Sequence, residues 1–407
     1  MRFNRYLLIL LLLFCSMLLS APISAQDFGD YPSLPDDLIF ISSYEVENED
    51  GTTTDVSELA LLDGGTLTYT SLGERLGVPL SWSPQGNKIA VGRFVAATDV
   101  RGVSEVAVCI ITIADVHEVC IEETTNLHYD SRFDVTWSDD GQKIYFTTWK
   151  EGILRLLEAD TTTGETVRII YDSGYRGDEW GIVLLVSWTQ NLSHIAIGVG
   201  RDYAKPGLLV NLETHEVVDM NELLQPYLYQ TDEGVVAKHS SICGDTNPLG
   251  DQQVFSPLDN YFVGFVSITY DDERRDGGRY IIFDVEGNVI QTFEIHADYP
   301  PCPVWSKDES KLYIPIYVYT PVSDWQESGW LIYEYSFEND EFTIYSPANL
   351  EVGTTIIPSS DETHMVFRGY YFGGYAVYVV YPDGVIRRLC EDEHYCYYPL
   401  WRPDNDE

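Results

Sequence analysis

The residues of this chain that could do chemistry are concentrated in the polar stretches between its apolar runs. These stretches combine aromatic rings with carboxylates and guanidinium groups, which suits them to bind sugars or protein surfaces. In the alternative interpretation, each aromatic side chain packs beneath its own loop. We expect any ligand to bind around Trp180, Tyr203, Tyr270, Asp271, Asp272, Arg274, Arg275, Trp325 and Tyr371.

Catalytic motifs do not account for these residues. The sequence has no Gly-x-Ser-x-Gly elbow of the kind that carries a hydrolase nucleophile. The segment from His215 to Asp219 begins like a zinc-protease helix, but its fifth residue is aspartate where the second histidine should stand. We therefore predict no catalytic residue, and we lean towards a protein that is not an enzyme.

A hard cation is the one cofactor that the sequence leaves open. Carboxylates at Asp271, Asp272 and Asp276, or at Asp172 with residues 178 and 179, could bind calcium through oxygen ligands. The alternative is a solvated acidic loop without any metal. No other cofactor is expected.

The elements that must position these residues come from an internal repeat. The segment VPLSWSPQGNKIAVG, from Val78 to Gly92, reads as a short strand, a tight turn and a second buried strand. Further copies start at residues 135, 186, 254, 304, 356 and 399. Their anchor residues are Trp82, Trp137, Trp188, Phe255, Trp305, Ile357 and Trp401, at spacings of 55, 51, 67, 50, 52 and 44 residues. Such spacing is typical of the blades of a propeller.

The repeat resembles that of the TolB-like β-propeller family, whose motif reads approximately W-S-P-D-G-x-x-I-A-F. The first copy matches it at Trp82, Ser83, Pro84, Gly86, Ile89 and Ala90, and the later copies depart from it further. The resemblance extends over almost the whole exported chain. It implies an all-β propeller and a non-catalytic binding role outside the membrane.

Each anchor copy is followed by a hairpin-like pair of apolar runs, so a blade has four strands. The last anchor, Trp401, has no strand after it, while residues 38–41 have no anchor before them. We predict that residues 397–401 form the innermost strand of a blade completed by residues 38–70, which closes a ring of seven blades. The alternatives are a degenerate anchor at Tyr31–Pro35 and a ring of six or eight blades.

Strand order then separates two faces of the predicted ring. Antiparallel strands put the first and third connections of every blade at one face, where the sequence has short turns. The second connections and the links between blades share the other face, where the sequence has long polar segments, among them expected loops at residues 93–104 and 368–375 and an expected link between blades at residues 220–250. We call it the long-loop face and expect ligands there, because binding residues usually lie on loops that a rigid scaffold displays.

The chain begins with a predicted secretory signal, and residues 1–25 combine two arginines, an apolar run and small residues before Gln26. A lipidated Cys15 is the alternative, but Phe14 stands where a small residue should precede it. Residues 26–407 are expected to form one propeller domain, without a membrane span after cleavage. The protein should be secreted or periplasmic.

Charge and cysteine content agree with export. The 65 acidic and 24 basic residues give a net charge of −41, which disfavours nucleic acid and suits a basic partner; salt adaptation is the alternative. A zinc site is disfavoured because no Cys-x-x-Cys pair occurs. Six cysteines outside the signal suggest disulfides, with Cys109 near Cys120, Cys390 near Cys396, and Cys243 and Cys302 before successive anchors.

Two classes of function follow from these features. The preferred one is a binding or scaffolding propeller that recognises a protein or an envelope glycan through the long-loop face. The alternative is a carbohydrate-active enzyme, a polysaccharide lyase or glycoside hydrolase, with its site at the propeller channel. Two carboxylates, or histidine with aspartate, clustered on the long-loop face would distinguish them.

Overall fold

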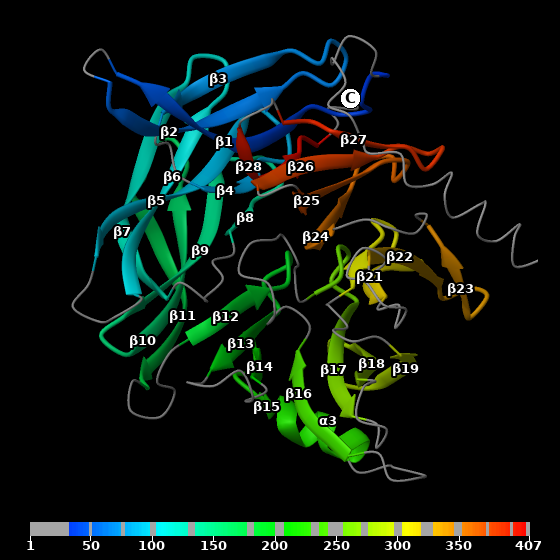
Figure 1. Cartoon of the computed structure of the whole chain (residues 1–407). Helices are drawn as coiled ribbons and strands as arrows, with labels where there is room; N and C mark the ends of the chain where they lie inside the picture. Colours follow the sequence, from blue (N-terminus) through cyan, green and yellow to red (C-terminus); the bar gives the residue numbers. More distant parts are fainter. Residues whose placement is uncertain are drawn as a thin grey trace, which may run out of the picture.

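The computed structural model is a ring of seven four-stranded antiparallel sheets (Figure 1). It describes residues 32–48, 51–74, 78–97, 103–128, 135–176, 183–199, 207–228, 236–242, 255–269, 276–296, 303–318, 329–345, 352–371, 374–390 and 394–403. The predicted fold class and blade number are confirmed. In each blade the strands follow one another from the inside of the ring outwards.

The first three blades contain the longest strands. Blade 1 consists of β28 (Tyr395–Trp401), β1 (Leu38–Glu47), β2 (Thr53–Leu62) and β3 (Tyr69–Glu74). Blade 2 consists of β4 (Val78–Trp82), β5 (Lys88–Ala97), β6 (Val103–Thr112) and β7 (His117–His128). Blade 3 consists of β8 (Val135–Trp137), β9 (Lys143–Lys150), β10 (Ile153–Asp160) and β11 (Thr166–Tyr175).

The other four blades complete the ring. Blade 4 consists of β12 (Val183–Trp188), β13 (His194–Val199), β14 (Leu208–Asn211) and β15 (Val217–Asp219), followed by the helix α3 (Met220–Leu228). Blade 5 consists of β16 (Val236–Ile242), β17 (Tyr261–Thr269), β18 (Asp276–Asp284) and β19 (Val289–His296). Blade 6 consists of β20 (Val304–Trp305), β21 (Lys311–Val318), β22 (Gly329–Ser336) and β23 (Glu341–Ile344). Blade 7 consists of β24 (Val352–Pro358), β25 (Met365–Tyr371), β26 (Gly374–Val380) and β27 (Ile386–Arg388).

The ring closes as predicted, because the C-terminal strand is the inner strand of the first blade. Figure 1 shows β28 in red beside β1 in blue, and Leu38 pairs with Trp401. The Trp401 indole Nε1 donates a hydrogen bond of 2.9 Å to the Ile357 carbonyl of blade 7. Residues 395–401 therefore tie the two ends of the described chain into one ring.

The hydrophobic core lies between neighbouring blades. The alternating apolar residues of each sheet pack on the next sheet, and the anchors Trp82, Trp137, Trp188 and Trp305 are at most 8 % exposed. Each fully buried Leu, Ile or Phe side chain contributes roughly 1.5–3 kcal/mol. The stability of the ring therefore depends on these sheet-to-sheet contacts.

Two repeat copies differ from the sequence prediction. In blade 7 the residue at the anchor position is Pro358, which pairs with Met365, and the predicted anchor Ile357 lies one position earlier. In blade 5 the inner strand is interrupted, because Ile242 pairs with Gly264 whereas Phe255 pairs with Phe262. Most of that inner strand thus precedes the predicted copy, within a segment that we had expected to be a link between blades.

The short turns after the inner strands share one geometry. The anchors of blades 2 to 7 pair with a residue seven positions later. The fourth residue after each anchor has φ between 56° and 63°, in the left-handed region. These residues are Gly86, Gly141, Leu192, Asp259, Glu309 and Glu362.

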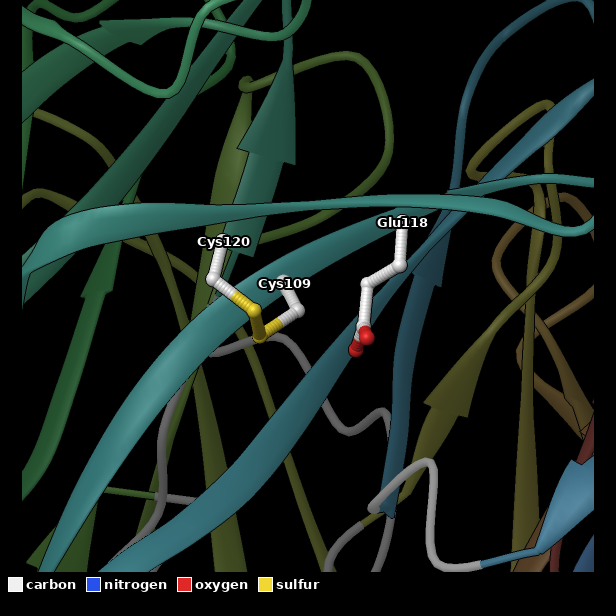
Figure 2. Close-up of side chains that lie close together, drawn as sticks. All are labelled: Cys109, Glu118 and Cys120. Atoms are coloured by element: carbon white, nitrogen blue, oxygen red, sulfur yellow. A yellow bond between two sulfur atoms is a disulfide. The ribbon is translucent and has the colours of Figure 1, made fainter.

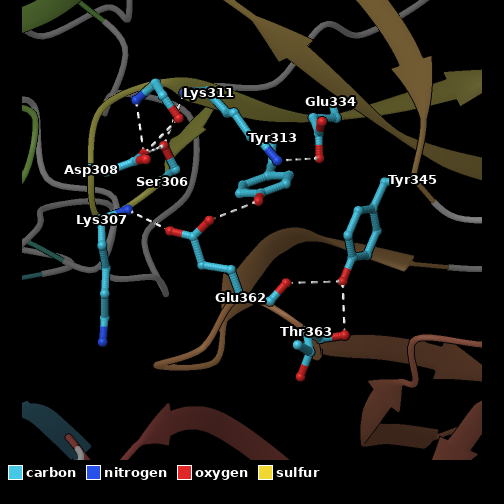
Figure 3. Close-up of polar contacts among 10 residues, drawn as sticks. Ser306, Lys307, Asp308, Lys311, Tyr313, Glu334, Tyr345, Glu362 and Thr363 are labelled. Atoms are coloured by element: carbon cyan, nitrogen blue, oxygen red, sulfur yellow. Dashed lines mark hydrogen bonds and ion pairs between the residues drawn. The ribbon is translucent and has the colours of Figure 1, made fainter.

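In blades 5 to 7 that left-handed residue is acidic and binds the turn of the preceding blade. Figure 3 shows the last of these contacts, in which Glu362 Oε1 accepts from the Lys307 amide at 2.7 Å. Its Oε2 atom accepts from the Tyr313 hydroxyl at 3.1 Å. Asp259 accepts from the Gln190 amide at 2.8 Å in the same manner.

In blades 2 and 3 the residue at this position is glycine. There, the side chain that bonds the two turns comes from the neighbouring blade instead. Arg402 Nε donates to the Gly86 carbonyl at 2.7 Å, and Gln85 Nε2 donates to the Asp139 carbonyl at 2.7 Å. A Cβ atom on Gly141 would lie 2.3 Å from Gln85 Oε1. Between blades 7 and 1, Asp36 accepts from the Ser360 amide at 2.7 Å. Hydrogen bonds within the described turns thus link consecutive blades around most of the ring.

Two disulfides confirm part of the cysteine prediction. Cys109 is bonded to Cys120 across the β6–β7 pair of blade 2 (Figure 2), and Cys390 is bonded to Cys396 where blade 7 leads into β28. All four belong to the expected pairs. Cys243 and Cys302 lie outside the described residues, so their pairing stays a prediction.

Candidate functional site

The two faces of the ring differ in how constant their connections are. The first connections of blades 2, 3, 4 and 6 have five residues each, at positions 83–87, 138–142, 189–193 and 306–310. The second connections, at the long-loop face, have from two residues (151–152) to ten (319–328). Connection length therefore varies widely at the long-loop face, while the described turns of the opposite face have four to six residues and join the blades.

The residues predicted as ligand contacts lie mostly outside the described part of the chain. This holds for Trp180, Tyr203, Tyr270, Asp271, Asp272, Arg274, Arg275 and Trp325. Tyr371 is the last residue of β25, and its backbone pairs with Gly374 at the long-loop end of blade 7. The structure thus places the Tyr371 backbone at the expected face, and ligand contact stays a prediction for all nine residues.

Several predicted loops are shorter than expected because the strands continue into them. The segment from Arg368 to Tyr375 was expected to be a loop, but β25 extends to Tyr371 and β26 begins at Gly374. Likewise, β5 extends to Ala97, where a loop had been expected from Arg93 onwards. Apart from Val95, the described residues of these extensions pair with the next strand of their hairpin, and this pairing overrides the turn-forming composition.

A group of exposed apolar side chains lies at the long-loop ends of blades 2 and 3. Phe94 and Val95 of β5 are 61 % and 50 % exposed, and Tyr175 at the end of β11 is 64 % exposed. The β5–β6 register shifts between Phe94 and Ala96, which is a β-bulge at Val95. In a regular strand, consecutive side chains point to opposite faces of the sheet, so these two apolar residues could not both be buried on one face. Here both are exposed.

An ion pair connects these two blades between the exposed residues. Lys150 at the end of β9 lies 2.8 Å from Glu105 Oε1 of β6, and both contact the Thr124 hydroxyl of β7. The hydrogen bond from Lys150 lowers the pKa of Glu105, as does that from Thr124. Glu105 is therefore a carboxylate at neutral pH, and its charge is balanced by the lysine of the next blade.

Backbone pairs connect the ion pair to the exposed aromatics on both sides. On one side, Glu105 pairs with Ala96, beside the bulge. On the other, Lys150 pairs with Ile153, which in turn pairs with Tyr175. We call Phe94, Val95, Glu105, Lys150 and Tyr175 the blade 2–3 strip. Sequence reasoning did not select its members, although the doublet Phe94-Val95, which breaks the alternation of β5, was the available signal.

The charged groups beside the strip are also paired. The Arg155 side chain lies 2.8 Å from Asp172 Oδ2, and the Asp172 pKa is lowered by the Gly174 amide and by Arg155. Asp172 had been considered as a calcium ligand with residues 178 and 179, which lie outside the described part. In the structure its carboxylate is bonded to a guanidinium and an amide, which are the contacts of a surface ion pair.

Three groups with metal-binding atoms lie close together in blade 2, as Figure 2 shows for Cys109, Glu118 and Cys120. The two sulfur atoms are bonded to each other, so neither is available as a thiolate ligand. Glu118 Oε1 lies 2.7 Å from the Arg93 guanidinium. This group is therefore a disulfide beside an ion pair.

Histidines were the other expected marker of catalysis. His394 lies where blade 7 leads into β28, with its ring stacked on Tyr44 at 4.4 Å and its Nδ1 atom 2.8 Å from the Ser42 hydroxyl. His194 follows a short turn on the opposite face, and burial lowers its pKa. These two described histidines are packed against aromatic or hydroxyl groups. Among the described carboxyl groups, every clearly shifted pKa is lowered, that of Asp308 to about 2.

Comparison with known proteins finds similarity to solved structures. No family model matches the chain, and no curated protein matches it. Among solved structures, TolB from Acinetobacter baumannii is 13 % identical, with 95 % of this chain and 89 % of that chain covered and a TM-score of 0.42. Oligogalacturonate lyase from Vibrio parahaemolyticus is 12 % identical, with coverages of 86 % and 93 % and a TM-score of 0.44.

A third neighbour comes from a study of two prolyl endopeptidases. It is 9 % identical, with 90 % of this chain and 51 % of that chain covered and a TM-score of 0.52. At this identity the likeness concerns the fold alone. Within the described residues, no helix has the length and apolar character to cross a membrane.

Proposed function

We propose that the protein is an exported, non-catalytic binding module that recognises a protein or cell-envelope component through its long-loop face. The observation that carries this proposal is the contrast between the two faces. Short turns of four to six residues join the blades at one face, as Glu362 does between blades 6 and 7, whereas connection length varies from two to ten residues at the other. A rigid ring that displays variable loops is a usual scaffold for recognition.

The chemistry of the described residues supports binding more than catalysis. A sugar hydrolase needs a general acid whose pKa is raised. The described carboxyls with clear shifts all have lowered pKa values, and the cause at Asp308 is hydrogen bonds from Ser310 and Ser306. These carboxylates accept hydrogen bonds within turns or form ion pairs. The large exposed side chains on the long-loop face, Phe94 and Tyr175, are residue types that anchor protein interfaces.

Export is supported by the disulfides, because such bonds form and persist in oxidising compartments. The predicted signal at residues 1–25 agrees with this setting. We propose that the working protein is residues 26–407, in the periplasm or outside the cell. We expect the net charge of −41 to disfavour nucleic acid as a partner.

A thermal-shift screen of residues 26–407 tests the proposal, because a ligand that binds the native state raises its midpoint. The panel contains calcium, other divalent cations and defined envelope polysaccharides, and each polysaccharide is also assayed for release of reducing or unsaturated ends. Stabilisation without product release supports a binding module. Product release from any polysaccharide would contradict the proposal and favour the carbohydrate-active alternative.

A further inference from the structure

We propose that the blade 2–3 strip docks a protein segment in which an apolar side chain is flanked by lysine or arginine. This inference rests on the proposed function and specifies where on the long-loop face the partner binds and what it presents. The strip provides apolar anchors at both ends, Phe94 with Val95 in blade 2 and Tyr175 in blade 3. Between them lies the Glu105–Lys150 ion pair.

The apolar part of the strip argues for a protein side chain instead of a sugar. The Val95 side chain offers a sugar neither a hydrogen-bonding group nor a ring face, so it would strip water from the hydroxyl groups of a glycan without replacing their hydrogen bonds. An apolar side chain has no such cost and gains from leaving water. Exposed apolar residues held together by a scaffold are typical of protein interaction sites.

The net charge of the protein indicates which residues should flank this apolar side chain in the partner. The net charge of −41 creates a field that attracts cationic segments and repels acidic ones. Near the strip, Lys150 and Arg155 are each paired with a carboxylate, so they do not oppose a cationic partner. Glu151, exposed in the turn next to Lys150, adds a carboxylate at the edge. A basic segment with an apolar centre therefore fits both the anchors and their surroundings.

The bulge and the ion pair also make the strip a fixed surface. The Trp149 amide donates to the Thr125 hydroxyl of blade 2 at 2.9 Å, next to the contact of Lys150 with Glu105. The Arg176 amide donates to the Gly152 carbonyl at 2.7 Å, beside Tyr175. The anchors of the two blades are thus held relative to one another before binding, which reduces the entropy lost on association.

Two fluorescent peptides of equal charge test this inference by anisotropy at near-physiological salt. One has leucines flanked by lysines, and the other has serine in place of each leucine. Binding is measured for residues 26–407, for the double variant Phe94→Ser with Tyr175→Ser, and for a control double variant, Val167→Ser with Ile169→Ser. The control residues are each 55 % exposed on the outer strand β11.

The expected result is that the leucine peptide binds at least tenfold more tightly than the serine peptide, and that only the strip variant removes this difference. Equal binding of both peptides, or unchanged leucine-peptide affinity in the strip variant, would overturn the inference. Thermal midpoints of both variants exclude unfolding as the cause. A natural partner that cross-links to other positions of the long-loop face and binds the strip variant normally would show that the strip is not the docking site. The proposed function would stand.

Discussion

Glu309 of blade 6 accepts a hydrogen bond of 2.7 Å from the Leu258 amide of blade 5, and it does so from a left-handed backbone position with φ of 59°. Its second oxygen accepts from Asn260 Nδ2 at 2.8 Å, and the residue is 7 % exposed. Glycine would be the ordinary residue at such a φ. An acidic residue at this position carries backbone strain, but its side chain forms hydrogen bonds between two blades.

Replacing Glu309 should therefore destabilise the ring in two separable ways. Glu309→Gly keeps the backbone conformation but removes both hydrogen bonds to blade 5, with an expected loss of about 1–3 kcal/mol. Glu309→Ala loses the same hydrogen bonds and keeps the left-handed strain that the Glu309 Cβ already causes, so it should be roughly 1 kcal/mol less stable than Glu309→Gly. Urea denaturation measures both, with the exposed Glu338→Ala as control. An alanine variant as stable as the glycine variant would contradict the role of the backbone position.

Two glycines of blade 3 form a matched pair that tests close packing between blades. Gly164 and Gly174 have φ of 74° and 64°, but a Cβ on Gly164 would lie 2.5 Å from the Cys120 carbonyl of blade 2, whereas Gly174 has nothing within 4 Å. Gly174→Ala should cost about 1 kcal/mol from backbone strain alone. Gly164→Ala should cost clearly more, because backbone must move. Equal losses in thermal unfolding would show that the blades tolerate the shift.

Stability should decrease in acid partly through Asp308. Hydrogen bonds from the Ser310 hydroxyl, the Ser310 amide and the Ser306 hydroxyl lower its pKa from 3.8 to about 2 in the folded protein. Because the folded pKa is the lower one, this contribution is complete above pH 3.8 and is lost as the pH falls through about 2.

The Asp308→Asn variant lacks this titration, so its stability should change less between pH 4 and pH 2 than that of the wild type. Chemical denaturation at several pH values measures the slope, and Asp55→Asn, on the exposed β2, is the control. A slope that Asp308→Asn leaves unchanged would show that other carboxyls account for the acid sensitivity.

Thiol counting tests the remaining cysteine prediction. Cys109–Cys120 and Cys390–Cys396 are bonded, so residues 26–407 should contain no free thiol if Cys243 pairs with Cys302. Labelling of the denatured, unreduced protein followed by mass spectrometry gives the number directly. Two labelled cysteines would contradict the third bond.

Loss of Cys109–Cys120 by Cys→Ser substitution should cost about 3 kcal/mol, since the bond closes an 11-residue loop.

Much of the fold was predictable because the same sequence motif, with the same local structure, recurs in several blades. An aromatic anchor, a five-residue turn and a buried strand recur, and the unpaired Trp401 and Leu38 runs indicated how the ring closes. The exceptions have local causes. Pro358 replaces the aromatic anchor and shifts the apparent copy by one residue, and the interruption between Ile242 and Phe255 separates the inner strand of blade 5 from its motif.

The candidate site was less predictable, since the sequence shows loop composition but not which loop residues meet. Lys150 and Glu105 are 45 residues apart, and their contact depends on the packing of blade 3 against blade 2. The bulge at Val95 depends equally on pairing with β6. Turn carboxylates such as Glu309 resemble surface acids in the sequence, and their bonds between blades appear only when the turns are placed side by side.

The most direct test of recognition through the long-loop face is site-specific photo-cross-linking in the organism that makes the protein. A photoreactive residue is placed at Phe94, on the long-loop face, or at Leu258, which is 59 % exposed on the short-turn face. We predict one or more discrete adducts with the probe at Phe94 and none with the probe at Leu258. Adducts from Leu258 alone, or equally from both positions, would contradict the account.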